Sequence, residues 1–424
     1  MTGLQLREHR TPVSVALGLA VMLVAINLRP AVASVGPVLH RIEVGEGLSN
    51  GGASALTTLP VLCFGLVAPA APLLARRLGV HAAVAVASSL LLAGQLIRLV
   101  TGVGFLFLGT ALAGSAIAIG NVLMPVMVRR DFTEHAGTAM SIFSACLIGF
   151  AALAAGVTVP VADALGGGWR PGLGIWALPA AVTALVWLPV LIRRGSPTVT
   201  ASPPAVPAEP RPRDLRRLLR NPLAWQVTLF FAVQSGGFYA TLSWLPSIFR
   251  SHGYSEAHAG VLLSVTLIVG IFTGLTVPSL AYRLRDQRIL VIASCLLSAL
   301  GWIGILVAPT SASYLWAVLL GLGQNASFPL VLMLIVLRGG SVRSTQALSA
   351  MAQSVGYGLA ALAPLAVGAI HGLTHAWTAD EILLLVLVLP QLLLGLGAGR
   401  PRQLSPPDPA APPSDPAPVA TQAR

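Results

Sequence analysis

The feature that most constrains this chain is a series of long apolar runs, separated by short polar breaks, that fills nearly the whole sequence. A helix needs about 20 apolar residues to cross the roughly 30 Å hydrocarbon core of a bilayer. Only 9% of the residues are charged, against about 25% in an average soluble domain, which excludes an ordinary water-soluble protein. The runs predict twelve membrane-spanning helices, near 13–39, 53–75, 80–100, 105–128, 137–161, 171–192, 222–249, 258–281, 289–308, 313–337, 346–370 and 381–398.

The positive charges indicate how these spans are oriented. All 26 basic residues are Arg, and 21 of them fall on one side of the membrane if both termini lie on that side. Arg41, Arg98, Arg170 and Arg250 fall on the other side. Because cytoplasmic loops collect basic residues, both termini are predicted to be cytoplasmic. The net charge of +12 is therefore interpreted as membrane topology, with no nucleic-acid partner expected.

A polar stretch at residues 193–221 divides the spans six and six. It combines six Pro with seven Arg, which is typical of a solvated linker lying on anionic lipid headgroups. The predicted organisation is a six-helix bundle over 1–192, this linker, a second six-helix bundle over 222–398, and a disordered Pro-rich tail over 399–424. The expected fold class is an all-α membrane protein.

Matching fragments in matching loops indicate an internal repeat. Residues 72–78 follow the second span, and the similar residues 278–284 follow the eighth, 206 positions later. The fragment 122–124 ends the fourth span, and 331–333 ends the tenth, 209 positions later. Two similar offsets at equivalent places favour two bundles built from a duplicated six-helix unit.

The first span has an alternative interpretation as a signal peptide. Arg7 and Arg10, an apolar stretch and the small residues 31–33 imitate such a peptide and its cleavage site. We favour a retained span, because Arg29-Pro30 interrupts the end of the apolar region and cleavage would leave eleven spans.

Arg29 is the charge that stands out within the apolar runs. It lies about 16 residues into the first span, or roughly 24 Å along a helix axis. A cation within the membrane costs at least a few kcal/mol and marks a functional site by default. The alternative is that the side chain extends to the outer headgroups, with Glu43 or Glu46 as its partner. We favour an anionic substrate as the counter-ion, because a planar guanidinium binds an anion through two hydrogen bonds.

Other polar side chains are distributed unevenly among the spans. The third, sixth, ninth and twelfth spans carry almost none at mid-depth, as expected for lipid-facing helices. The first, fourth, seventh, tenth and eleventh spans carry side chains that we expect to bind a solute or shape its cavity, although each amide could instead bond to a neighbouring helix. These candidates are Asn27, Asn121, Gln234, Tyr239, Trp244, Gln324, Asn325, Gln353 and Tyr357.

Several chemistries find no support in the residues. The acidic and His residues all fall near span ends or in loops, so no mid-span group favours proton coupling. Cys63, Cys146 and Cys295 are single and flanked by apolar residues, unsuited to metal or disulfide spacing. The Gly pair at 321–323 lies inside a span with no strand before it, and the chain has no Lys for a phosphate-binding loop. We therefore expect no enzyme activity, cofactor or metal.

Five short motifs occur in order along the chain. They are Asn27-Leu28-Arg29-Pro30, Thr58-Leu59-Pro60-Val61-Leu62-Cys63-Phe64-Gly65, Gly120-Asn121-Val122-Leu123 with Arg130-Asp131-Phe132, Ser243-Trp244-Leu245-Pro246, and Gln353-Ser354-Val355-Gly356-Tyr357. Together they resemble the cyanate permease and 2-nitroimidazole transporter family of the major facilitator superfamily. The resemblance covers residues 13 to 400, and it implies the two-bundle major facilitator fold in a bacterial inner membrane.

The loop after the second span departs from the superfamily pattern Gly-x-Leu-Ala-Asp-Arg-x-Gly. Pro72 and Arg76 stand in place of the Gly and the Asp, so the charge relay associated with that Asp is not carried over. Arg76, Arg77, Arg129 and Asp131 remain candidates for latching the cytoplasmic ends of the helices.

These observations predict a secondary transporter that moves a small, cyanate-like anion or a small polar solute by alternating access. The alternative is an exporter of uncharged nitroimidazole-like or drug-like compounds, in which Arg29 is structural. A remote alternative is a non-transporting membrane sensor that docks partners through its linker or tail. The expected partners are a small solute and the lipid bilayer. The direction of transport, the coupling ion and the oligomeric state stay open, and a monomer is compatible with the prediction.

Overall fold

The computed structural model describes residues 12–132, 136–192 and 217–404, and all regular structure in these ranges is helical. The first half contains α1 (Pro12–Leu28), α2 (Pro30–Ala33), α3 (Val35–Glu46), α4 (Asn50–Val67), α5 (Ala70–Leu78), α6 (Val80–Ile97), α7 (Val103–Asp131), α8 (Ala136–Ala164), α9 (Trp169–Gly174) and α10 (Ala177–Ile192). The second half contains α12 (Pro222–Ser251), α13 (Glu256–Ile268), α14 (Gly270–Arg283), α15 (Arg288–Val307), α16 (Ser313–Gly339), α17 (Val342–Ala360), α18 (Leu362–Thr374), α19 (Trp377–Val386) and α20 (Val388–Ala398). The predicted all-α fold is confirmed. Most of the predicted linker and tail lies outside the described residues.

Each predicted span corresponds to one helix or to a short series of consecutive helices. Within the described ranges, ten segments are long and apolar enough to cross a membrane, and the bent first span adds an eleventh. The helix α12 takes the place of the remaining predicted span. It is 30 residues long, enough to reach roughly 45 Å, but it is less apolar and does not meet the same criterion.

The break in the first span follows directly from its sequence. α1 ends at Leu28 and α2 begins at Pro30, whose missing N–H cannot continue the helical hydrogen-bond ladder. The carbonyl of Arg29 accepts the first bonds of α2, from the N–H groups of Val32 and Ala33 at 3.0 and 2.9 Å. The chain then bends by 46° into α3. Arg29 is thereby held at a turn within the membrane span.

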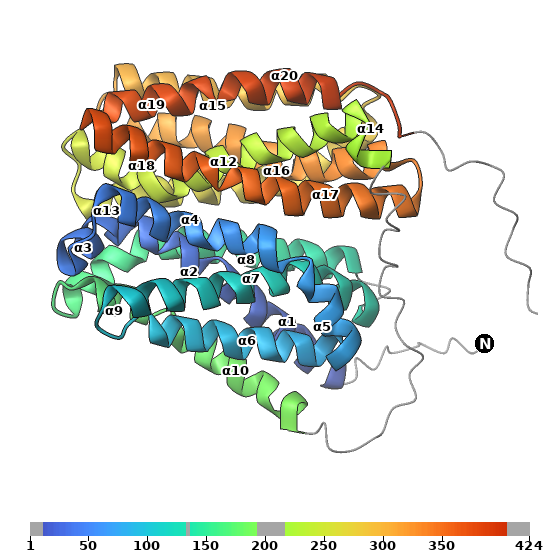
Figure 1. Cartoon of the computed structure of the whole chain (residues 1–424), viewed down its shortest axis with the longest axis horizontal. Helices are drawn as coiled ribbons and strands as arrows, with labels where there is room; N and C mark the ends of the chain where they lie inside the picture. Colours follow the sequence, from blue (N-terminus) through green and yellow to red (C-terminus); the bar gives the residue numbers. More distant parts are fainter. Residues whose placement is uncertain (1–11, 133–135, 193–216, 405–424) are drawn as a thin grey trace, which may run out of the picture.

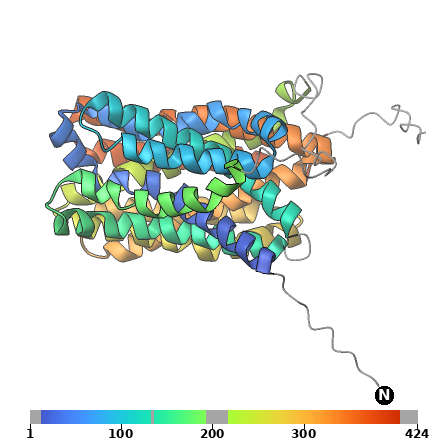
Figure 2. The ribbon, with the colours of Figure 1, turned by 90° about the horizontal axis from the view of Figure 1, so that it is seen from below.

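The helices of the two halves form two adjacent bundles whose axes run along the long dimension of the molecule (Figure 1). The chain begins α1, ends α10, begins α12 and ends α20 at the same end of the molecule, which we call the linker end. The opposite end, where α3 leads into α4 and α18 leads into α19, is the far end. The view in Figure 2, turned by 90°, shows the same long parallel packing.

Small residues meet where the two bundles pack on one another. α8 packs on α13, and α4 packs on α17 and α18. A Cβ atom added to Gly65 would lie 2.9 Å from the backbone nitrogen of Gly358, and one added to Gly260 would lie 2.6 Å from the carbonyl oxygen of Ala155. Real Cβ atoms do not approach backbone atoms so closely. Larger residues at these positions would therefore push the bundles apart.

Candidate functional site

A cavity of about 370 Å³ lies between the two bundles. α8 contributes one wall, and α12, α14 and α16 contribute most of the others. The lining extends to Pro278 on α14 and Val336 on α16, within about two turns of the linker ends of these helices. Among the described residues that line it, Arg29 alone carries a charge. The cavity therefore runs from the level of Arg29 toward the linker end.

Arg29 faces aromatic groups of the opposite bundle. Its Nη1 atom donates to the hydroxyl oxygen of Tyr239 at 3.4 Å, and its Cζ atom lies 5.6 Å from the ring centre of Phe238. No carboxylate of the described chain lies within ion-pair distance of this guanidinium. Glu43 pairs instead with His40 at 3.5 Å, and Glu46 pairs with Arg170 at 2.5 Å. The expected alternative partners of Arg29 are therefore engaged elsewhere.

A second arginine supports the turn that carries Arg29. Arg98 follows α6 and is 1% exposed, and its Nη1 atom donates to the carbonyl oxygen of Ala31 in α2 at 2.8 Å. The carbonyl belongs to the short helix that follows the break. This bond fixes the backbone two residues beyond Arg29, so Arg98 positions the site without lining it. The sequence interpretation had placed Arg98 on the outer side, and its burial was not apparent.

Two amides contribute polar atoms to the cavity. Gln234 is 3% exposed, its Nε2 atom donates to Ser235 Oγ at 2.6 Å, and its Oε1 atom has no partner among the described residues. Asn325 donates from Nδ2 to the carbonyl oxygens of Thr266 at 2.9 Å and Gly321 at 2.8 Å. With both of its N–H groups used in this way, Asn325 can offer its Oδ1 atom as an acceptor, whereas the Gln234 Oε1 atom is buried. The cavity thus combines one cation with an acceptor that suits an N–H or O–H of a solute.

Aromatic rings form much of the wall around Arg29. Tyr239 and Phe238 line the cavity on α12, and Phe328 lines it on α16. Tyr357 lies behind Tyr239, with ring centres 6.3 Å apart, and packs edge-on against Phe231 at 4.9 Å. Tyr357 therefore supports the wall from a second layer and is not itself among the lining residues.

The structure brings four of the predicted site residues together and leaves the others outside the cavity. Arg29, Gln234, Tyr239 and Asn325 line it. The remaining candidates make other contacts or face elsewhere: Gln324 donates to Thr241 at 2.8 Å, Gln353 to Ser349 at 2.9 Å and Trp244 to the carbonyl oxygen of Pro364 at 3.2 Å, while Asn121 is half-buried on α7.

Asn27 does not line the cavity, although it precedes Arg29 by two residues, and its bonds stay within its own bundle. It is 2% exposed, and its Nδ2 atom donates to Thr183 Oγ1 at 2.8 Å and to the carbonyl oxygen of Pro179 at 3.2 Å. These bonds join α1 to α10. The Asn27 amide therefore bonds to a neighbouring helix, which is the alternative to solute binding that the sequence leaves open.

The predicted latch residues lie at the linker end. Asp131 bonds to His81 Nε2 at 2.8 Å, which joins the end of α7 to the start of α6 within one bundle. Arg76 and Arg77 are exposed on α5, and the side chain of Arg129 lies outside the described part. Arg338 was not predicted. It is 4% exposed and donates from Nε to the carbonyl oxygen of Ala398 at 2.8 Å, which clamps α16 to α20.

Ion pairs that sequence reasoning missed lie at the far end, and one of them joins the two bundles. Arg41 on α3 lies 2.7 Å from Asp163 and 2.5 Å from Glu256, and the second of these pairs joins the two bundles. His252 and His371 each pair with a buried carboxylate at the same end. No cluster of three or more His, Cys, Asp or Glu side chains suited to a metal occurs in the described part of the chain.

Relatives of known name share sequence with nearly the whole chain. An uncharacterized transporter of Bacillus subtilis is 37% identical over 385 residues, which cover 91% of this chain and 93% of the relative. The 2-nitroimidazole transporter of Escherichia coli is 35% identical over 384 residues, which cover 91% and 95%. The cyanate transport protein of the same organism is 30% identical over 364 residues, which cover 85% and 91%.

Solved transporter structures share the fold at low sequence identity. A nucleoside transporter carrying one substitution superimposes with a TM-score of 0.72 at 13% identity, covering 90% of this chain and 99% of that one. A bacterial homolog of the human lysosomal transporter Spinster, inward-facing and unoccupied, gives 0.68 at 15% identity and covers 94% and 100%. The sequence pattern of the Major Facilitator Superfamily matches residues 14–399, as the motifs predict. The chain therefore belongs to the Major Facilitator Superfamily of membrane transporters.

Proposed function

We propose that this transporter moves a small planar anion, such as cyanate or a somewhat larger organic anion, and that Arg29 binds its charge in the cavity between the bundles. The observation that carries the proposal is a half-buried guanidinium that lines the cavity with no carboxylate partner in the described chain. A cation within the membrane is costly unless a negative charge compensates it. The solute supplies that charge.

The walls favour a planar solute. A guanidinium is flat and donates two parallel hydrogen bonds to an anion, while Phe238 and Tyr239 offer ring faces and edges beside it. The volume of about 370 Å³ lies at the lower end of the range for small-molecule sites, about 300–1,000 Å³. Cyanate has three heavy atoms and would occupy a small part of this space, so a ring-sized anion also fits.

The direction in which the cavity extends supports alternating access with the cytoplasmic side open. The Arg-rich breaks favour a cytoplasmic location for the linker end, and the cavity extends toward that end while an ion pair joins the bundles at the far end. We therefore infer a location in the bacterial cytoplasmic membrane with both termini cytoplasmic. In this mechanism the six-helix bundles over 1–192 and 222–398 would rotate relative to one another about the site.

A second candidate is export of an uncharged nitroimidazole-like compound. The relative named a 2-nitroimidazole transporter is 35% identical over most of the chain. The Asn325 Oδ1 atom could accept a ring N–H, and Arg29 could donate to nitro oxygens. Deletion of the gene would sensitise cells to 2-nitroimidazole under this function and would not do so if the solute is a cyanate-like anion.

The decisive experiment is uptake of labelled cyanate into proteoliposomes. Loss of a hydrogen-bonded charge pair of about 1.5–3 kcal/mol predicts at least a tenfold fall in uptake for Arg29→Ala, with partial recovery in Arg29→Lys. Arg285→Ala is the matched control, because Arg285 is exposed in the loop between α14 and α15. Undiminished uptake by Arg29→Ala would contradict the anion-binding role.

A further inference from the structure

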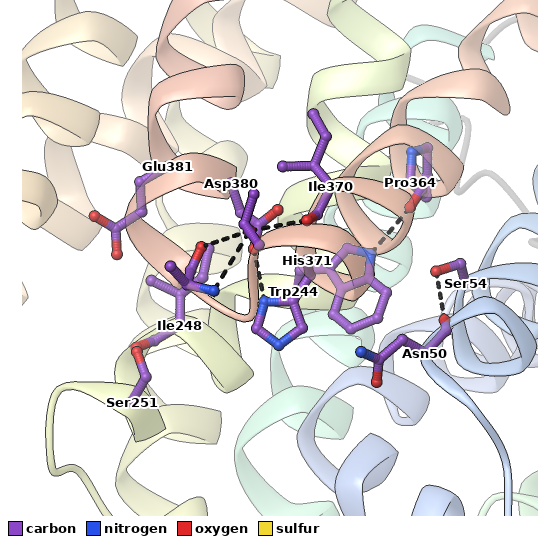
Figure 3. A network of polar contacts seen from close by, with 12 residues as sticks. Asn50, Ser54, Trp244, Ile248, Ser251, Pro364, Ile370, His371, Asp380 and Glu381 are labelled. Atoms are coloured by element: carbon purple, nitrogen blue, oxygen red, sulfur yellow. Dashed lines mark hydrogen bonds and ion pairs between the residues drawn. The ribbon is translucent and has the colours of Figure 1, made fainter.

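Two acidic residues at the start of α19 are buried at the far end of the molecule. Asp380 is 0% exposed and Glu381 is 1% exposed. Asp380 Oδ2 lies 2.9 Å from His371 Nδ1 on α18, and Glu381 Oε1 lies 2.8 Å from His252 Nε2 at the end of α12. Figure 3 shows Asp380 and His371 joined in this way, with Glu381 directed to the other side of the helix. Two separate His–carboxylate pairs thus share one helical turn.

The carboxylates receive little other compensation. The second oxygens, Asp380 Oδ1 and Glu381 Oε2, are buried and have no hydrogen-bond partner among the described residues. Trp377 stacks on His371 with ring centres 3.8 Å apart, and the His371 side chain keeps 16% of its surface exposed. Arg250 on α12 pairs with Glu256 rather than with either carboxylate.

The surrounding helices add few further charges. On α3, Glu43 interacts electrostatically with His371 and Arg250 and pairs with His40. α15 and α20, which also pack on α19, bring no titratable side chain to this end. A buried carboxylate is strongly unfavourable unless a positive charge or a proton compensates it. Each pair therefore needs one proton, either on the imidazole or on the carboxyl group, to be neutral as a whole.

We propose that the pairs His371–Asp380 and His252–Glu381 form a proton-binding site whose occupancy holds the far end closed. Each pair binds one proton, on a ring nitrogen or a carboxyl oxygen. Closing takes these protons from the solution at the far end, and opening hydrates the carboxylates and releases the protons to that solution. This proton binding requires no acidic residue in the middle of the membrane, because the protons bind at the far end and not beside the solute.

The position of the site connects it to the movement of the bundles. α18 packs on α4 of the other bundle, and a Cβ atom at Gly368 would collide with Ser54. Trp244 contacts the same part of α18 through its bond to Pro364, and in Figure 3 it lies between His371 and the residues Asn50 and Ser54. Glu43 on α3 of the other bundle interacts electrostatically with His371, so separation of the bundles would remove this negative charge from the His371–Asp380 pair. The inference rests on the alternating access proposed above.

The direct test measures the width of the far end as a function of pH. Spin labels on Leu165→Cys and Leu373→Cys, both exposed and on opposite bundles, report this width by pulsed electron resonance once Cys63, Cys146 and Cys295 are replaced by Ala. The closed distance should dominate at about pH 5.5 and give way to a longer one by about pH 8.5. Linkage predicts that the closed-to-open ratio falls about tenfold per pH unit for one released proton and about a hundredfold for two.

Variants with uncharged side chains in place of the two carboxylates distinguish proton binding from a purely structural hydrogen-bonding role. Asp380→Asn with Glu381→Gln keeps the shape and a hydrogen-bonding group but needs no proton, so it should stay closed at every pH. A purely structural role of the carboxylates predicts instead that this variant opens at every pH. His81→Gln is the matched control, because His81 forms a similar pair with Asp131 at the linker end and its loss should leave the titration unchanged.

The pH dependence of the spin-label distance in the wild type tests the proton site even if the double variant does not fold. A wild-type distance distribution that does not change with pH, while saturating solute still changes it, would overturn the proton site and leave alternating access intact. A double variant that titrates like the wild type would also overturn it. A far end that responds to neither pH nor solute would instead contradict the proposed transport mechanism, and the proton site with it.

Discussion

Arg41 joins the two bundles at the far end, and its replacement should loosen that end by a predictable amount. Its contact with Asp163 lies within the first bundle, so that pair survives when the bundles separate. Its contact with Glu256 at 2.5 Å crosses between the bundles and must break. Glu256 keeps a second partner, Arg250 at 3.4 Å in its own bundle, and is therefore not left unpaired in the open state.

The magnitude follows from the exposure of the pair. The side chains of Arg41 and Glu256 are 20% and 17% exposed, so water screens them only partly. Exposed pairs contribute about 0.2–1 kcal/mol, and we assign this pair the upper end of that range. A loss of about 1 kcal/mol changes an equilibrium constant by about fivefold. The closed-to-open ratio of Arg41→Gln should therefore be about fivefold lower than that of the wild type.

The spin-labelled pair at positions 165 and 373 measures this ratio at fixed pH. Asp163→Asn is the matched control and should change the ratio less than about twofold, because its bond does not cross between the bundles. High salt should reduce the difference between wild type and Arg41→Gln, since partly exposed charges are screened. Equal effects of the two substitutions would refute the assignment of Glu256 as the partner that matters.

Three further substitutions test other parts of the structure. Asn27→Ala removes the bonds to Thr183 and Pro179, so we expect a loss of stability of about 1–2 kcal/mol in thermal unfolding with little change in solute affinity. Asn325→Leu removes an acceptor oxygen from the cavity wall, so binding of 2-nitroimidazole measured by calorimetry should weaken about tenfold while that of cyanate, which has no N–H, changes little. Gly65→Val places a side chain against the backbone of α17, and uptake should fall at least tenfold because the bundles can no longer meet there.

The membrane fold was predictable because it depends on the hydropathy and charge of individual residues, which the sequence shows directly. Apolar length and Arg placement locate the spans, and the helices agree with them in position. α12 is the exception that shows the limit, since its polar residues lower its apolar character while packing between helices keeps it inside the bundle. Helix breaks were less accessible, although Pro30 indicated the one beside Arg29.

The site was only partly predictable, because depth along a span does not determine which way a side chain faces. Gln324 and Asn325 are neighbours at one depth, yet Asn325 lines the cavity and Gln324 bonds to Thr241. Arg29 was identifiable because an intramembrane charge is unusual whichever way it faces. The buried pairs of Asp380 and Glu381 were missed, since each member lies at a span end and pairing across three helices leaves no local signal.

The break between α1 and α2 has a consequence for how a solute and the two bundles influence one another. The cation at the break belongs to the first bundle, whereas the aromatic rings and amide oxygens around it belong to the second. Under the proposed function, an anionic solute would be bound through its charge by the first bundle and through the rest of its surface by the second, and would link the two bundles while it is bound. A movement that separates the bundles would then weaken the contacts of the solute with both of them. We therefore expect the solute-bound and the empty transporter to change conformation at different rates.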